Sequence, residues 1–94
     1  MFDMTDWASM ALAGTFAYAM TSPRPVNEVA DRLAADFMQQ CFRQGYNVYE
    51  VSAALSYDGG YNYHGTVFWT DRGIRYRRVV VATATVSCLS WQLR

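Results

Sequence analysis

The stretch YNYHGTVFWTDRGIRYRRVVVATATVSC, residues 61–88, decides the fold that the sequence predicts. Over residues 60–70 the odd positions carry most of the large apolar side chains, and over residues 74–88 the even positions carry them. A period of two is typical of β-strands that bury one face. The change from odd to even positions fits a tight turn around Asp71-Arg72-Gly73, with Thr70 opposite Gly73. Two antiparallel strands joined by a hairpin are therefore expected here.

A third strand is expected over residues 46–57, where the odd positions are again the more apolar ones. The turn Asp58-Gly59-Gly60 fits a three-residue hairpin loop that pairs Tyr57 with Tyr61. An alternative for this region is a helix that restarts at Asn47, with Glu50 completing a capping box.

Two helices are indicated before the strands. The clearer one starts near Val26 and ends at Gly45, because its apolar residues recur at helical spacing. Residues 4–20 read as a first helix, although Gly14 in its middle weakens that interpretation. The expected fold is α+β: one or two N-terminal helices packed on one face of a three-stranded antiparallel β-meander, as a single domain over residues 1–94.

The last residues break the pattern. After Cys88 the apolar positions become odd, at Leu89, Trp91 and Leu93, which indicates a β-bulge or a break. A tail over residues 89–94 that leaves the meander could dock on another copy, so we expect a homo-oligomer through this segment.

Charge is distributed unevenly along the chain. The net charge is zero, yet residues 1–71 hold eight acids against three arginines, a net of −5, and residues 72–94 hold five arginines and no acid, a net of +5. This polarity favours association with an acidic partner, unless the two halves neutralise each other within the fold. Every fixed cation is an arginine, which biased codon usage in a GC-rich genome would also produce.

The predicted strands leave one side of the sheet uncovered by helices. On that side Phe68, Val79 and Val81 lie near Arg75 and Arg77, and apolar residues beside arginine are typical of protein interfaces. The alternative is a solvated face with scattered apolar residues. The candidate binding residues are His64, Phe68, Arg72, Arg75, Arg77, Arg78 and Val79.

Arg78 is unusual because the alternation places it on the core side, opposite Gly65. The small residues there would leave a notch in which Arg78 forms an anion site. The alternative is a structural arginine paired with a helix acid such as Asp36 or Glu28.

Catalysis is not indicated. His64 is the only histidine, and Cys41 and Cys88 show no metal-ligand spacing, so we expect two buried thiols and no metal or cofactor. The predicted register puts His64 on the open face and Cys88 on the core face, which separates the members of a nucleophile pair. The apolar run from Trp7 to Met20 is too short to span a bilayer and lacks a basic start, so a cytoplasmic, membrane-free protein is expected.

These features favour a small non-enzymatic protein-binding module that acts through the open face of its C-terminal sheet. A lysine-free binding domain without motifs is a profile found among phage and other mobile-element accessory proteins, including inhibitors of host defence complexes. The alternative is a single-stranded nucleic-acid-binding protein that uses the arginine and aromatic residues of the hairpin. Neutral net charge argues against that alternative.

Overall fold

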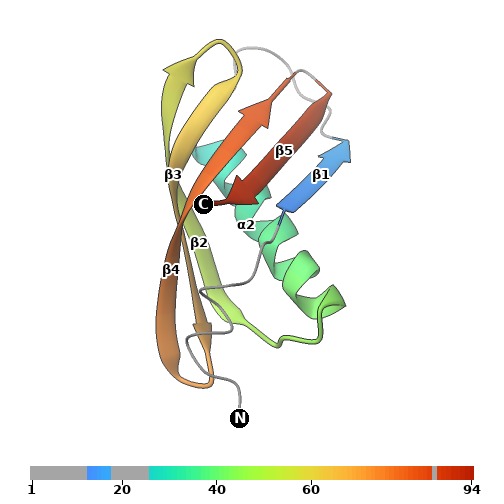
Figure 1. Cartoon of the computed structure of the whole chain (residues 1–94), viewed down its shortest axis with the longest axis vertical. Coiled ribbons are helices and arrows are strands. Elements are labelled where there is room, and N and C mark those ends of the chain that lie inside the picture. Colours follow the sequence, from blue (N-terminus) through green and yellow to red (C-terminus); the bar gives the residue numbers. More distant parts are fainter. Residues whose placement is uncertain (1–12, 18–25, 86) are drawn as a thin grey trace.

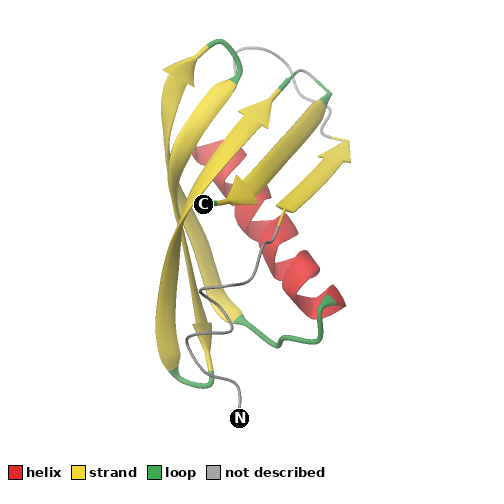
Figure 2. Cartoon of the chain, viewed as in Figure 1, coloured by secondary structure: helices red, strands yellow, loops and turns green. Residues whose placement is uncertain are grey.

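The structure, a computed structural model, describes residues 13–17, 26–85 and 87–94 of the 94-residue chain. The described elements, in chain order, are β1 (Ala13–Ala17), α2 (Val26–Arg43), β2 (Tyr49–Gly59), β3 (Asn62–Asp71), β4 (Ile74–Ala84) and β5 (Cys88–Leu93). The five strands form one antiparallel sheet in the order β1-β5-β4-β3-β2, with α2 on one side (Figures 1 and 2). Within the described ranges, no helix is long and apolar enough to cross a membrane.

The α+β class is confirmed, but the three-stranded meander is wrong because the sheet has two more strands. Residues 13–17, expected inside a first helix, form β1 and pair with β5. Glycine and threonine favour a helix interior poorly, and the strand gains ladder hydrogen bonds from β5. The remainder of the expected first helix, residues 4–12 and 18–20, lies outside the described residues.

The C-terminal tail is the fifth strand and does not leave the sheet. β5 lies between β1 and β4, and Leu89, Trp91 and Leu93 are buried on the core side. A hairpin turn explains the change of phase: the amide of Thr85 donates to the Cys88 carbonyl at 2.8 Å, so even positions on β4 face odd positions on β5. The bulge expected at this point is therefore wrong, and so is a projecting tail.

Helix α2 is confirmed and supplies one layer of the core. Its fully buried side chains include Val29, Leu33, Phe37 and Cys41, at helical spacing. The helix ends where Gly45 adopts φ 90° and the Tyr46 amide donates to the Cys41 carbonyl at 2.9 Å, a left-handed helix cap. After this cap the chain enters β2, which excludes the alternative of a helix restarting at Asn47.

The core centres on stacked aromatic rings between α2 and the sheet. Phe37 lies 4.9 Å from Trp69 and 5.8 Å from Trp91, measured between ring centroids, and Trp69 stacks on Tyr76 at 5.7 Å. α2 packs against both edges of the sheet, at β1 and, more extensively, at β2. The helix therefore crosses the sheet from one edge strand to the other.

Both hairpin registers differ from the predicted ones by two residues. Tyr57 pairs with Tyr63 rather than Tyr61, and Asp71 rather than Thr70 is the last residue of β3, pairing with Ile74. The β2–β3 turn has two residues, Gly60 and Tyr61, where a three-residue loop was predicted, and a bulge between Tyr57 and Gly59 accommodates the remaining residue. The β3–β4 turn consists of Arg72 and Gly73, one residue later than predicted. A slip of two residues keeps each side chain on its predicted face, so most of the predicted core side is correct while the predicted pairs are not.

Candidate functional site

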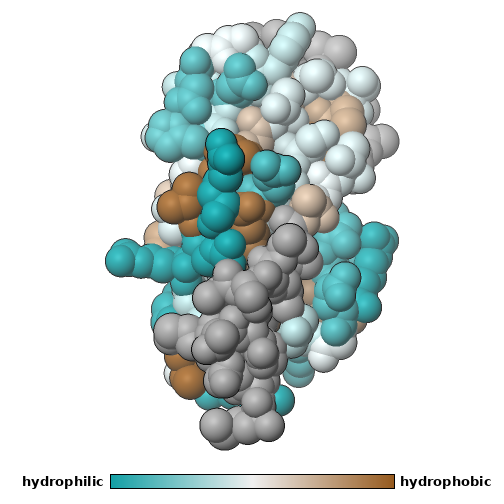
Figure 3. Space-filling model, viewed as in Figure 1, coloured by the Kyte–Doolittle hydropathy of each residue, from teal (hydrophilic) through white to brown (hydrophobic). Residues whose placement is uncertain are grey.

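The open face is the side of the sheet opposite α2, and in Figure 1 the helix lies behind β4 and β5. The cross-strand rows of the open face follow from the register: Ser52, Phe68 and Arg77; then Ala54, Thr66 and Val79; then Ser56, His64, Val81 and Gln92. In Figure 3, hydrophobic side chains gather over β4 near the C-terminal end of the chain, and hydrophilic side chains border them.

Four of the predicted binding residues lie together on this face. We call Phe68, Arg75, Arg77 and Val79 the arginine cluster. Val79 is 54% exposed, although it is a β-branched apolar residue, and Phe68 beside it is half-buried. The guanidinium carbon of Arg75 lies 5.7 Å from the centre of the Phe68 ring, a cation–π distance.

Arg75 is held in place by the sheet edge. Its Nη1 donates to the Glu50 carbonyl oxygen at 2.5 Å and to the Thr70 hydroxyl at 3.2 Å. Glu50 adopts φ 53° within the irregular start of β2, which turns its carbonyl toward Arg75. Arg75 is therefore fixed over Phe68, whereas Arg77 is exposed on the same face.

The other three predicted residues lie elsewhere. Arg72 occupies the β3–β4 turn, and Arg78 is on the core side. His64 shares the open face but lies four positions before Phe68 on β3, about 13 Å along the strand. The candidate site is therefore smaller than the predicted set of seven residues.

The anion notch predicted at Arg78 does not form at the expected position. Arg78 pairs with Val67, not Gly65. Its Nε and Nη2 donate to the main-chain oxygen of Arg94 at 3.2 and 3.0 Å, so the guanidinium binds the end of β5 to β4. The helix acid Asp36, considered as its partner, instead accepts a hydrogen bond from Trp91 Nε1 at 2.6 Å.

His64 contacts an acid at the far end of the open face. Its Nδ1 lies 2.6 Å from Asp58 Oδ1, and both side chains are substantially exposed. Cys88, expected on the core face, is partly exposed on the same side as His64, because it alternates with the buried Leu89 at the start of β5. Cys88 lies two strand spacings from His64 and four residues along β5, which together amount to roughly 17 Å. The two side chains are therefore too far apart to form a nucleophile pair, although they lie on the same side of the sheet.

Cys41 is a buried thiol, as expected. Burial, and to a lesser degree the nearby Asp71 carboxylate, raises the pKa of Cys41 to about 12. At neutral pH this thiol is protonated and unreactive. Among the described residues no group of three or more histidine, cysteine or acidic side chains is placed to hold a metal ion.

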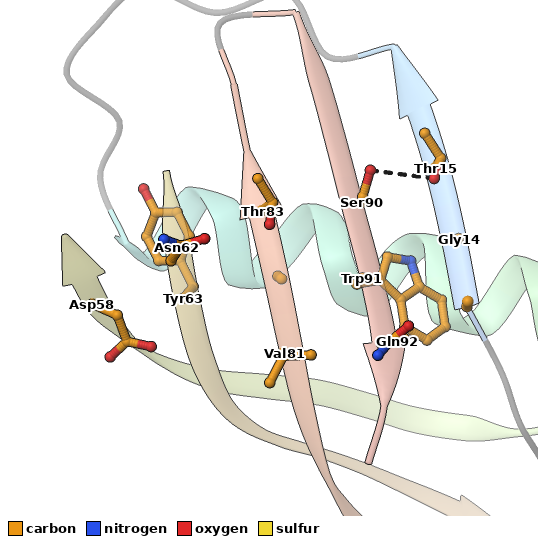
Figure 4. A pocket seen from close by; sticks show the side chains of 12 residues that line it. Gly14, Thr15, Asp58, Asn62, Tyr63, Val81, Thr83, Ser90, Trp91 and Gln92 are labelled. Carbon is orange, nitrogen blue, oxygen red and sulfur yellow. Dashed lines mark hydrogen bonds between the residues drawn. The ribbon is translucent and has the colours of Figure 1, made fainter. Parts of the chain in front are cut away.

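A shallow hollow of about 490 Å³ lies on the open face, and no residue of the arginine cluster lines it. Figure 4 shows that side chains from several strands line it, and five of these end in hydroxyl or amide groups: Thr15, Asn62, Thr83, Ser90 and Gln92. Thr15 donates to the Ser90 hydroxyl at 3.3 Å. The open face therefore has an apolar, arginine-bearing part and a polar part that includes the acid Asp58.

The sequence interpretation missed one surface. Tyr57 and Tyr61 were expected on the core side, yet they are 55% and 57% exposed. The molecule extends 44 Å along its long axis, whereas an 18-residue helix covers only about 27 Å, so the β2–β3 hairpin projects beyond α2. The glycine and tyrosine composition of residues 56–64 was the available signal.

Comparisons with protein-family models, with curated proteins and with solved structures found no match. Function is therefore inferred from the residues and geometry of this chain alone.

Proposed function

We propose that this chain is a small, non-enzymatic protein-binding module whose contact surface is the arginine cluster on the open face. The supporting observation is the exposed Val79 beside the half-buried Phe68, with Arg77 opposite Phe68 and Arg75 next along β4. An aromatic ring and arginines around an apolar centre form the usual composition of a binding hot spot. The partner surface would be acidic and apolar, to match Arg77 and Val79.

The biological setting belongs to the same proposal. A phage or mobile-element accessory protein that binds and inhibits a host defence complex needs a contact surface and no catalytic machinery, and its action would be in the cytoplasm. The size of the chain and its lysine-free composition support this setting.

The test uses two variants with the same charge change on the same face. Val79→Asp places a carboxylate in the apolar centre, whereas Thr83→Asp places one on β4 about 14 Å away. The immobilised chain is incubated with nuclease-treated bacterial lysate, bound proteins are identified by mass spectrometry, and the affinity of the purified partner is then measured. We expect Val79→Asp to weaken binding about tenfold or more and Thr83→Asp to change it little.

Equal binding by wild type and Val79→Asp would contradict the proposal, as would a partner that is lost with Thr83→Asp alone. Capture that occurs only from lysate without nuclease treatment would point to nucleic acid instead.

Single-stranded nucleic acid is the second candidate. The observation in its favour is Arg75 fixed over Phe68, with Arg77 beside them, which offers one base-stacking ring and two cations. Against it, the register places few aromatic rings on the open face, Phe68 and, at the first residue of β2, Tyr49 opposite Thr70, whereas open-sheet binders stack successive bases on several rings.

Fluorescence anisotropy with a labelled single strand at low and high salt tests this candidate. Binding that falls steeply with salt and is weakened by Phe68→Ser would support it. No measurable affinity at low salt would exclude it.

A further inference from the structure

Strand β2 forms the edge of the sheet opposite β1. Within residues 13–17, 26–85 and 87–94, β3 is the only strand that pairs with it, so the main-chain groups on its outer side have no strand partner there. An exposed strand edge of this kind can pair with a strand of another chain. Proteins usually prevent such pairing with charged residues, proline or bulges along the edge.

The middle of β2 lacks these protective features. Register irregularities occur only near its two ends, between Tyr49 and Ser52 and between Tyr57 and Gly59. Residues 51–57 read Val-Ser-Ala-Ala-Leu-Ser-Tyr, without a charge, a proline or a glycine. We call residues 51–57 the β2 edge. Seven residues of strand span about 24 Å, which is long enough for a ladder of several hydrogen bonds.

The core side of the β2 edge is incompletely buried. Val51, Ala53 and Leu55 pack against the core, yet each of them stays partly exposed. On the neighbouring strand β3, the core-side residues Val67 and Trp69 are fully buried. Helix α2 thus leaves apolar area uncovered at this edge, and a further strand beside β2 would remove part of that area from water.

The same edge of a second copy is the partner that fits best. A disordered peptide would lose conformational entropy on pairing, whereas β2 of a second copy is already extended in its own sheet. The β2 edge carries no charged side chain, so it offers no ionic contact to a phosphate group or another charged ligand. The net charge of the chain is zero, so no overall repulsion opposes self-association.

Two-fold symmetry selects the register of this pairing. A two-fold axis at Ala53 places Val51 opposite Leu55 of the second copy, so that partly buried apolar side chains meet on the core side. An axis at residue 54 would instead place Glu50 opposite Asp58, which are like charges. The register centred on Ala53 is therefore favoured.

We propose that two copies of this chain pair through their β2 edges and form one continuous antiparallel sheet with a two-fold axis at Ala53. The contact is isologous, so it closes at the dimer. The axis is perpendicular to the sheet, so both copies of α2 lie on one side and both arginine clusters on the other. Bivalent binding by the two clusters rests on the proposed function, whereas the β2 contact does not.

Sedimentation velocity over a concentration series tests the proposal. A contact about 24 Å long is at the small end of specific interfaces, so we expect a wild-type dimer with a dissociation constant in the micromolar range. The sedimentation coefficient should rise with concentration to that of a dimer and no further.

Charge changes at the β2 edge provide the variants. Ser52 and Ala54 are exposed on the open face and oppose each other across the proposed axis. An acidic variant, Ser52→Asp/Ala54→Asp, and a basic variant, Ser52→Arg/Ala54→Arg, each put like charges in both cross-strand pairs. Each variant is expected to weaken dimerisation about tenfold or more. An equimolar mixture puts opposite charges in the same pairs and should dimerise more strongly than either variant alone.

The matched controls are Thr83→Asp/Gln92→Asp and Thr83→Arg/Gln92→Arg. They make the same charge changes at exposed positions of the open face on β4 and β5, and they should dimerise as the wild type does. Thermal unfolding shows which variants keep the fold.

Hydrogen exchange of wild-type amides gives a second readout that needs no variant. The amides of residues 51–57 that point away from β3 should exchange at least about tenfold more slowly at concentrations where the dimer predominates than in the monomer. The amides of β1, at the other edge of the sheet, should exchange equally at both concentrations.

Four results would overturn the proposal: a wild-type chain that stays monomeric up to about 1 mM, controls that weaken association as much as the edge variants do, a mixture no stronger than its components, and exchange of the β2 amides that is independent of concentration. None of these measurements involves a binding partner, so failure of the β2 contact leaves the proposed function of the open face standing.

Discussion

Asp36 is an acid on α2 that the helix carries into the interior, where only 8% of the residue is exposed. Its Oδ2 accepts the Trp91 indole hydrogen at 2.6 Å and lies close to the backbone of β1 at Gly14. A Cβ on residue 14 would collide with both side chains, so glycine is what allows helix and edge strand to approach. One hydrogen bond thus joins α2 to β5 beneath β1.

Trp91→Phe is predicted to destabilise the fold by about 2 kcal/mol, because it keeps most of the apolar volume and leaves the buried Asp36 without its indole donor. Urea unfolding measures the change. Gln92→Ala, at an exposed position on the same strand, serves as the control and should change stability by less than about 0.5 kcal/mol. Equal stability of wild type and Trp91→Phe would show that the bond contributes nothing.

The raised pKa of Cys41 predicts a loss of stability in alkali. Its pKa is about 12 in the folded state against an ordinary value of 9.0, so below pH 9 the thiol is protonated in both states and contributes no pH dependence. Between pH 9 and 12 only the unfolded thiol ionises, which favours unfolding by about 1.4 kcal/mol per pH unit. Unfolding of Cys41→Ala across this range should have a shallower slope, and identical slopes would contradict the prediction.

At the scale of elements, tight turns set the registers of the sheet. Arg72 and Gly73 have φ of 54° and 80°, the two left-handed residues of a type I′ hairpin turn. This turn pairs Asp71 with Ile74 and so fixes which residues of β3 and β4 are neighbours. Gly73 indicated in the sequence that a turn was present. The sequence did not indicate a type I′ turn, because arginine at position 72 seldom adopts a left-handed conformation.

Arg72→Asn is predicted to stabilise the protein by about 0.5 to 1 kcal/mol, since asparagine adopts the left-handed conformation more readily than arginine. Gly73→Ala should have the opposite effect, with a loss of about 1 kcal/mol or more. Denaturant midpoints of the two variants give the comparison. Changes of the same sign would argue against a type I′ turn.

Removal of residues 88–94 is predicted to abolish the cooperative fold. β5 lies inside the sheet and contributes Leu89, Trp91 and Leu93 to the core, and its loss would also leave β1 without a partner. Near-ultraviolet circular dichroism and thermal unfolding of the shortened chain measure this. A truncated chain that still unfolds cooperatively would show that β5 is dispensable.

At the scale of the whole molecule, folding places the arginine-rich end of the chain and its acid-rich part in one sheet. β4 carries three arginines and lies, together with β5, between strands from the acid-rich region, so the polarity along the sequence is partly neutralised. Arg78 binds the end of β5, and Arg75 binds the edge of β2. Of the five C-terminal arginines, Arg75 and Arg77 remain on the face proposed for binding.

Arg77→Glu and Val79→Asp are predicted to change stability by less than about 0.5 kcal/mol, because both side chains are exposed. Urea unfolding provides the measurement. Unchanged stability of both variants is required before a loss of partner binding can be attributed to the arginine cluster and not to unfolding. A loss of several kcal/mol in either variant would mean that the arginine cluster is part of the folded core.

The sequence by itself determined α2, the period of two over residues 49–84 and the faces of β2, β3 and β4, because helical spacing and strand alternation are local patterns of apolar residues. It also determined that Phe68, Arg75, Arg77 and Val79 share the open face, since a slip of two residues leaves these side chains on their side.

Only the tertiary structure decided the strands at residues 13–17 and 88–93, the registers of the β2–β3 and β3–β4 hairpins, and the exposure of Tyr57 and Tyr61. β1 is a strand because β5 pairs with it, and β5 joins the sheet because β4 turns back at Thr85. Tyr57 and Tyr61 are exposed because α2 does not reach as far as their hairpin. Each of these depends on contacts between residues far apart in the chain, which a local pattern does not encode.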